Sequence, residues 1–186
     1  MEFKTYLEKS RQNLDLLIDL APKIDQSIKL IEDCIKSQNT LFFCGNGGSA
    51  ADSQHLAAEF MGRFLIDRRP LSAIALTVDT SALTAIGNDY GYDNIFSRQL
   101  EGLGQEGDIL YAISTSGNSA NVLKAIEVAK SKGIKTIALT GEVDSEMSKL
   151  CEITIAVPSN ETNHIQEMHI IVGHYICGRV ESSLFS

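Results

Sequence analysis

Four hydroxyl side chains within six residues form the most distinctive chemical pattern of this chain. Residues 114–119 read Ser-Thr-Ser-Gly-Asn-Ser and lie between an apolar run that predicts a strand and a stretch that predicts a helix. Hydroxyl groups beside the free N–H groups at the start of a helix can bind a phosphate without any cationic side chain. A polar turn whose Ser119 caps the helix is the alternative. The density of hydroxyls favours phosphate binding, with candidate contacts at Ser114, Thr115, Ser116 and Ser119.

A glycine-rich loop at residues 45–50 joins another predicted strand to the helix that follows it. It reads Gly-Asn-Gly-Gly-Ser-Ala, and glycines let a backbone turn tightly and approach a ligand. The spacing loosely resembles a dinucleotide-binding fingerprint. However, no acidic residue closes a second strand about 20 residues later, so nicotinamide binding is not expected. A turn that needs small residues explains the glycines, but it explains Asn46 and Ser49 less well.

A third polar segment, residues 86–91, reads Ile-Gly-Asn-Asp-Tyr-Gly. Asn88 and Asp89 would either bind sugar hydroxyls or shape a turn, and the sequence leaves both interpretations open. We expect all three segments to be loops at the carboxyl ends of the strands, where open α/β sheets bind their ligands.

The ionisable candidates lie on two predicted helices. His55 and Glu59 are four residues apart and therefore share one helix face, where they suit a divalent metal or acid–base chemistry. Taken alone, such a pair is more simply a surface hydrogen bond. Gln166 and His174 are eight residues, or about 12 Å, apart along the last helix. One metal reaches both only if the side chains stretch toward each other or a neighbouring subunit supplies one.

The last predicted helix carries three histidines in an otherwise apolar stretch. A lone histidine among apolar neighbours is more often a satisfied core residue than a ligand, and this reading applies first to His174. His164 and His169 have no partner that the sequence identifies, so we interpret both as structural.

These side chains need a scaffold, and the apolar pattern predicts one α/β domain. Short, nearly all-apolar runs alternate with helical stretches, which is typical of a parallel sheet covered by helices on both faces. We expect five strands, at about residues 40–44, 71–78, 108–113, 134–139 and 153–157. Helices are expected at about residues 49–64, from the second strand to 88, and at 95–103, 119–132 and 163–184.

The N-terminal 2–37 segment predicts a long helix. Apolar residues recur at three-, four- and seven-residue steps, and Pro22 is expected to kink or divide the helix. A stripe of this length needs a partner, which would be the body of the domain or another subunit. Periodicity alone does not show whether the stripe packs on its own domain or on another subunit.

Composition excludes several classes of protein. The chain has 186 residues, a net charge of −8 and no basic cluster beyond Arg68-Arg69, which argues against nucleic-acid binding. No signal peptide and no apolar run near 18 residues is present, so neither secretion nor a membrane span is expected. The cysteines lack metal-site spacing and are interpreted as reduced core residues of a cytoplasmic protein: Cys34, Cys44, Cys151 and Cys177.

Three motifs together resemble the sugar isomerase (SIS) family. They are the glycine loop with Gln-His-Leu-Ala-Ala-Glu-Phe at 54–60, the serine loop, and Ile-Gln-Glu-Met-His at 165–169. The resemblance is strongest to the phosphoheptose isomerase branch and covers nearly the whole chain. It implies that residues 1–36 form a helical segment that packs on the domain or on a partner subunit. Residues 37–186 would form a single SIS domain, with a parallel five-stranded sheet flanked by helices.

The resemblance also implies a reaction and a site. The reaction is conversion of sedoheptulose 7-phosphate to D-glycero-D-manno-heptose 7-phosphate, the first step toward the heptose of bacterial surface polysaccharide. The protein would be a homotetramer with active sites between subunits and one zinc ion per subunit. Implied zinc ligands are His55, Glu59, Gln166 and His174, and implied substrate contacts are Asn46, Gly47, Gly48, Ser49, Glu59, Asn88, Asp89, Ser114, Thr115, Ser116, Ser119 and Gln166.

Aldose–ketose isomerisation moves a proton between C1 and C2 through an enediol, which requires an acid–base pair. The family's proposed pair corresponds to Glu59 and His174, and we expect Glu59 to act as base and His174 as proton shuttle. Two rival functions remain. SIS relatives include an isomerase of another sugar phosphate and a non-catalytic protein that binds the replication initiator DnaA. The non-catalytic branch lacks the glutamate and the terminal-helix histidine, whereas this chain has both.

Overall fold

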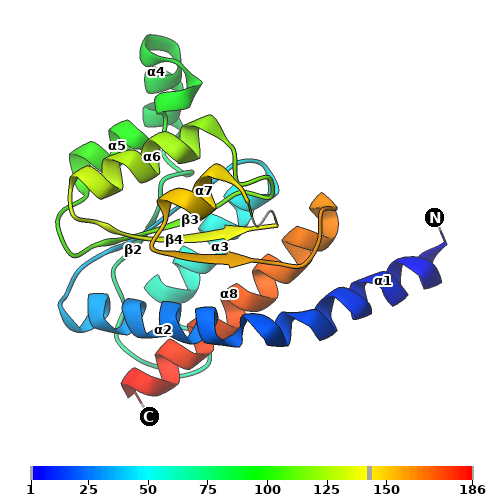
Figure 1. The fold of residues 1–186 in the computed structure, drawn as a ribbon. Helices are drawn as coiled ribbons and strands as arrows, with labels where there is room; N and C mark the ends of the chain where they lie inside the picture. The colour runs from blue at the N-terminus through cyan, green and yellow to red at the C-terminus, as the bar shows by residue number, and fades with distance from the viewer. Residues whose placement is uncertain (1, 142–143, 186) are drawn as a thin grey trace.

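The computed structural model describes residues 2–141 and 144–185, and its strands form one parallel sheet (Figure 1). The strand order is β2-β1-β3-β4-β5. Every residue of β1 and β3 is buried, because helices cover both faces of the sheet. The strands are β1 (Leu41–Gly45), β2 (Ala73–Ala75), β3 (Ile109–Ile113), β4 (Lys135–Thr140) and β5 (Ile153–Ala156).

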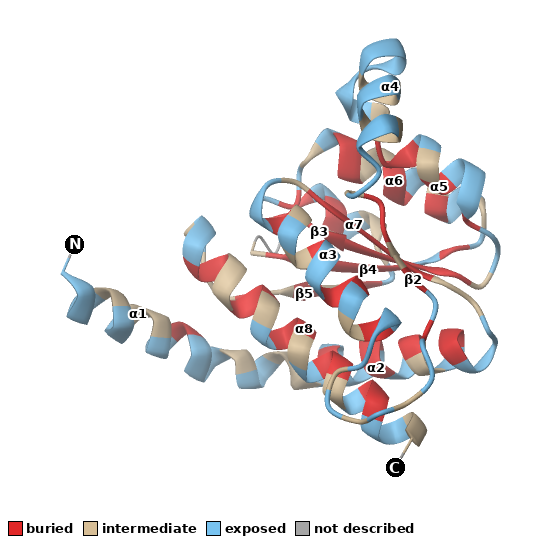
Figure 2. Ribbon diagram, turned by 180° about the vertical axis from the view of Figure 1, so that it is seen from behind, coloured by how far each residue is buried: buried red, intermediate tan, exposed pale blue. Residues whose placement is uncertain are grey.

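Two helical layers enclose two apolar cores. One core lies between the sheet and helices α2 (Ala21–Lys36), α3 (Gly48–Met61) and α8 (Thr162–Phe185). The other lies beneath α5 (Ser97–Leu103), α6 (Ala120–Ser131) and α7 (Glu146–Leu150). Figure 2 shows the buried residues concentrated in the sheet and on the inner helix faces. The single α/β domain with five parallel strands is therefore confirmed.

Strands β1 and β3 create the place where a ligand can bind. They are neighbours, with Gly45 opposite Ile113, and the chain leaves them toward opposite edges of the sheet. Such a switch point opens a crevice beyond the carboxyl ends of the strands. The glycine loop follows β1 and the serine loop follows β3, so the topology brings both predicted loops to the same crevice.

Helices α3 and α8 approach each other closely at Gly173. A Cβ atom on Gly173 would lie 2.6 Å from Cδ2 of Leu56, so only the missing side chain allows this approach. Both residues are buried, and each is adjacent in sequence to a candidate site histidine, His174 and His55 respectively. The contact therefore determines how near the two histidines can come.

Two segments project from the body of the domain. Helix α1 (Phe3–Asp15) and the 3-10 turn η1 (Leu16–Leu20) extend past α8, and α4 (Thr80–Tyr90) with η2 (Tyr92–Asn94) stands out at the opposite end (Figure 1). The apolar stripe of α2 packs on the sheet, whereas Asn13 is the one buried residue of α1. Phe3, Leu7 and Ile18 are exposed.

The predicted division of the N-terminal helix is confirmed, whereas several other predicted boundaries were wrong. The N-terminal helix divides at η1, just before Pro22, which occupies the first turn of α2 because a proline there gives up no hydrogen bond. The second strand spans 73–75 rather than 71–78, and the short helix α7 was not predicted. Residues 86–90 are the last turn of α4 rather than a loop, and the helix ends at Gly91.

Among the described residues, no helix has the length and apolar character needed to cross a bilayer.

Candidate active site

A cavity of about 240 Å³ lies at the crevice between the glycine and serine loops. Its walls also include the first turns of α3 and α8, and helix N-termini provide free N–H groups that favour anions. Eight predicted substrate contacts line it together: Asn46, Gly47, Gly48, Ser49, Ser114, Thr115, Ser119 and Gln166. Thr162, which sequence reasoning missed, completes the lining.

The serine loop holds its own hydroxyls in place. The Oγ atoms of Ser114 and Ser119 are hydrogen-bonded at 2.9 Å, and Ser114 Oγ also accepts from the Gly117 N–H at 3.2 Å. Ser119 stands at the N-cap of α6 but makes no side-chain cap hydrogen bond. The interpretation of Ser119 as only a helix cap is therefore wrong, and its hydroxyl faces the cavity.

Asn46 is held by two residues that the sequence did not reveal. Its side-chain amide exchanges hydrogen bonds with that of Asn121 on α6, at 2.9 and 2.8 Å. The hydroxyl of Tyr92 donates to Asn46 Oδ1 at 3.1 Å. This network joins the glycine loop to α6 and to η2, and it fixes the orientation of the Asn46 amide. Neither residue belongs to a motif, so no local signal pointed to them.

Gln166 extends from α8 over the first turn of α3. A Cβ atom on Gly48 would lie 2.4 Å from Gln166 Nε2, so the amide occupies the space that a side chain at position 48 would take. Gln166 is thus part of the cavity between the two loops, which we call the phosphate cavity after the ligand that the sequence predicts for it. It lies about 12 Å along the axis of α8 from His174, so its implied role as a metal ligand stays a prediction.

The remaining predicted substrate contacts lie elsewhere in the chain. Ser116 lines a neighbouring cavity of about 180 Å³, together with Thr115 and Thr162. Asn88 and Asp89 are exposed on α4, where Asn88 Nδ2 donates to Asp89 Oδ1 at 2.8 Å. Neither lines the phosphate cavity of its own chain.

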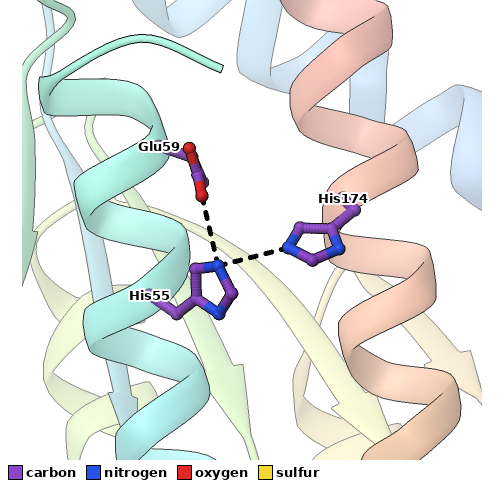
Figure 3. Close-up of side chains that lie close together, drawn as sticks. All are labelled: His55, Glu59 and His174. Carbon is purple, nitrogen blue, oxygen red and sulfur yellow. Dashed lines mark hydrogen bonds and ion pairs between the residues drawn. The ribbon is translucent and has the colours of Figure 1, made fainter. Parts of the chain in front are cut away.

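Three ionisable side chains meet where α3 and α8 lie side by side (Figure 3). His55 Nε2 lies 3.1 Å from Glu59 Oε1 and 3.3 Å from His174 Nε2. The ring centroids of the two histidines are 4.9 Å apart with an interplanar angle of 73°, which is a T-shaped contact. His174, interpreted first as a core residue, is instead half-buried and faces His55.

The cluster fits a divalent metal ion. One ligand atom from each of His55, Glu59 and His174 lies within 4.8 Å of the others. Two ligands on a tetrahedral zinc at about 2.1 Å lie roughly 3.4 Å apart, close to the observed 3.1 and 3.3 Å. Two imidazole nitrogens and a carboxylate oxygen are also a common zinc donor set. The side chains are therefore already placed near ligand positions.

Asp52 stands close to this cluster, one turn before His55 on α3. Its Oδ2 atom is buried and has no hydrogen-bond partner among the described residues. Burial raises the pKa of the Asp52 carboxyl, and the charges of His55 and His174 oppose that rise. Sequence reasoning missed Asp52 because a single aspartate in a helix carries no pattern.

The two other histidines of α8 are buried away from the cluster. His164 Nδ1 is hydrogen-bonded to Glu167 at 3.0 Å and to Ser10 of α1 at 3.2 Å. Burial lowers the pKa of His169 to about 4, although a hydrogen bond to the Thr140 backbone acts to raise it. His169 is therefore neutral at pH 7, and both residues support the fold.

Comparisons with known proteins agree with this geometry. The family model described as the SIS domain matches residues 5–141. A phosphoheptose isomerase from Akkermansia muciniphila is 54% identical over 93% of this chain and 92% of its own. One from Rhodospirillum rubrum is 51% identical over 100% and 98%. The solved phosphoheptose isomerase from Neisseria gonorrhoeae superimposes with a TM-score of 0.91, at 41% identity over 96% of each chain.

This chain belongs to the SIS family of sugar isomerases. Its likeness to the phosphoheptose isomerases covers almost the full length of both chains, so it is an isomerase of that branch. In this SIS enzyme, the phosphate cavity and the ionisable cluster share the same pair of helices, α3 and α8.

Gly48→Ala tests the phosphate cavity of this SIS domain. The added Cβ displaces the Gln166 amide without disturbing the backbone, because alanine is favourable in the first turn of a helix. We expect affinity for a sugar phosphate to fall roughly 3- to 10-fold, the value of a hydrogen bond. The melting temperature should change little. Isothermal titration calorimetry and thermal unfolding measure both quantities.

The matched control is Gly102→Ala on α5, where the Cβ meets nothing within 4 Å. If Gly48→Ala binds the sugar phosphate as tightly as Gly102→Ala does, Gln166 is not part of the binding site.

Proposed function

We propose that this chain interconverts sedoheptulose 7-phosphate and D-glycero-D-manno-heptose 7-phosphate. The observation that carries the proposal is the shared placement of the two sites on α3 and α8. The phosphate cavity lies at the N-terminal ends of both helices. His55 lies about 10 Å along α3 from Gly48, and His174 lies about 12 Å along α8 from Gln166. A long sugar phosphate can therefore anchor its phosphate at one end and present C1 and C2 at the other. The names of the relatives support the seven-carbon substrate.

Glu59 and His174 are the acid–base pair of this proposal. The Glu59 carboxylate takes the proton from C1 of the ketose and returns it at C2, and His174 moves the proton between the two substrate oxygens. The hydroxyls and backbone N–H groups of the phosphate cavity hold the sugar, so the reacting carbons stay beside Glu59. Side chains of Asn46 and Gln166 line the same cavity and orient the chain of the sugar.

We assign one divalent ion, zinc, to each subunit, held by His55, Glu59 and His174. When bound, it supplies a Lewis acid that polarises the substrate oxygens. A carboxylate that binds a metal is a weaker base, so Glu59 must keep one of its two oxygens free for the carbon-bound proton. Because Glu59 is the only carboxylate of the three-residue cluster, it has to serve both roles.

We also propose a homotetramer with active sites between subunits. Support comes from the apolar side chains that the domain leaves uncovered on α1, η1 and α8, including Phe3, Ile18 and Tyr175. Asn88 and Asp89 are exposed on the projecting α4 and do not line the phosphate cavity of their own chain, which supports a role for them in the site of a neighbouring subunit.

The cellular setting is part of the same proposal. We place the protein in the cytoplasm, at the first step toward ADP-heptose and surface polysaccharide. The four cysteines are all unpaired, and Cys34, Cys44 and Cys177 are buried, as expected for a reducing compartment.

Glu59→Gln tests the proposed base. Glutamine keeps the shape and one acceptor oxygen but cannot take a proton from carbon. We expect turnover of sedoheptulose 7-phosphate to fall about 10²- to 10⁴-fold, while binding of the sugar phosphate changes only a few-fold. A discontinuous assay of the aldose product and calorimetric titration measure the two quantities. Glu127→Gln, at an exposed position of α6, is the control and should retain full activity. Substantial residual turnover would exclude Glu59 as the base.

Metal content tests the proposed zinc site. Protein purified without chelators should contain about one zinc per subunit by inductively coupled plasma mass spectrometry. His55→Ala should lose most of it, because two ligands cannot hold the ion as tightly as three. Gln54→Ala, at the exposed neighbouring position, should retain the wild-type content. Equal zinc in wild type and His55→Ala would contradict the ligand assignment.

A further inference from the structure

A buried carboxylate holds the segment that follows α3. Glu181 of α8 accepts hydrogen bonds from the backbone N–H groups of Phe64, Leu65 and Ile66, at 2.9, 2.6 and 2.9 Å. Burial disfavours its ionised form, but these three donors and Arg68 outweigh burial and hold the pKa of Glu181 below its usual value. Glu181 therefore carries a charge inside the protein and fixes three consecutive residues.

Arg68 completes a clamp between this segment and the end of α3. Its Nε atom lies 3.0 Å from Glu181 Oε1, and the two side chains are only 3% and 2% exposed. Its guanidinium donates to the carbonyl oxygens of Glu59, Phe60 and Gly62, at 2.7, 2.8 and 2.8 Å. These carbonyls lie at the C-terminal end of α3, where the helix itself offers no donors. We call Arg68 and Glu181 the Arg68–Glu181 clamp.

The clamp places the ring of Phe64 against His174. The two ring centroids are 5.5 Å apart with an interplanar angle of 24°, so the rings are stacked. His55 meets the same imidazole in a T-shaped contact at 73°, so His174 contacts two rings. The Phe64 ring also lies over α8, where a Cβ on Gly178 would be 3.3 Å from its Cε1 atom.

We propose that Phe64 is a positioning residue that fixes the plane of the His174 imidazole. The final torsion of a histidine side chain is broad, so backbone position alone does not orient the ring. The stacked Phe64 removes that freedom and directs Nε2 of His174 toward His55 and Glu59. The Arg68–Glu181 clamp keeps Phe64 in place, and the same clamp holds the backbone of Glu59. This inference deepens the proposed function and rests on the role assigned there to His174.

The first measurement tests the stacked contact between Phe64 and His174 without relying on activity. Histidine ring signals are recorded by ¹H–¹³C NMR on the metal-free protein, and His174→Gln assigns the signal. A stacked aromatic ring shifts the His174 ring protons through its ring current. Phe64→Tyr should keep this shift, and Phe64→Leu should lose it. A His174 signal at the same position in Phe64→Leu as in wild type would overturn the proposal.

Two functional measurements follow from the same variants. Supporting groups outside the ligand set typically change metal affinity about 10- to 100-fold, so zinc affinity of Phe64→Leu should fall by about 10-fold in a chelator competition. Its kcat should fall while KM stays within about twofold of wild type, because the phosphate cavity is untouched. Phe64→Tyr should restore wild-type zinc affinity and kcat. Loss of both in Phe64→Tyr, despite an intact NMR shift, would also contradict positioning by the ring.

Phe96→Leu is the matched control. It removes the same atoms from the core on the opposite face of the sheet, where Phe96 is 2% exposed. We expect it to lower the melting temperature while the His174 signal and zinc affinity remain unchanged. A shift of the His174 signal in Phe96→Leu would mean that general loosening explains the Phe64 result. If the wild type fails to turn over sedoheptulose 7-phosphate, the proposed function fails, whereas the NMR measurement still decides the role of Phe64.

Discussion

The close approach of α3 and α8 at Gly173 is the constraint on which the site depends. Any side chain at position 173 would meet the Cδ atoms of the buried Leu56 side chain, so Leu56 or the helices would have to shift. His55 and His174 adjoin Leu56 and Gly173, and the Nε2 atoms of the two histidines lie 3.3 Å apart beside this contact. The same pair of helices begins at the phosphate cavity. One packing contact thus sets the relation between the binding end and the reacting end of the site.

Chemically identical side chains perform different tasks here because their neighbours differ. Glu181 is buried, fully hydrogen-bonded and paired with Arg68, which stabilises its charge and makes it a fixed structural group. Glu59 is part-exposed and contacts a histidine that can share a metal or a proton. The histidines of α8 divide in the same way, since His164 and His169 are enclosed by the fold. His174 alone among them faces the His55–Glu59 pair.

The sequence predicted what depends on local pattern. The alternation of apolar runs with helices was sufficient for the sheet, and the hydroxyls at 114–119 and glycines at 45–50 were sufficient for the phosphate cavity, because chain topology brings these two loops together. Asn121, Tyr92, Asp52 and Phe64 were missed, since each acts through a contact between distant segments. The division of the N-terminal helix near Pro22 was predicted. The exposure of α1 was beyond reach, because periodicity shows a stripe but not what covers it.

The central claim is that the phosphate cavity and the His55–Glu59–His174 cluster together isomerise a seven-carbon sugar phosphate. The most direct measurement compares initial rates of the wild-type protein with sedoheptulose 7-phosphate, fructose 6-phosphate and arabinose 5-phosphate under one set of conditions. The account predicts a kcat/KM for sedoheptulose 7-phosphate well above that for the two shorter sugars. Activity on neither the heptulose nor the shorter sugars, together with tight binding of DnaA, would contradict it.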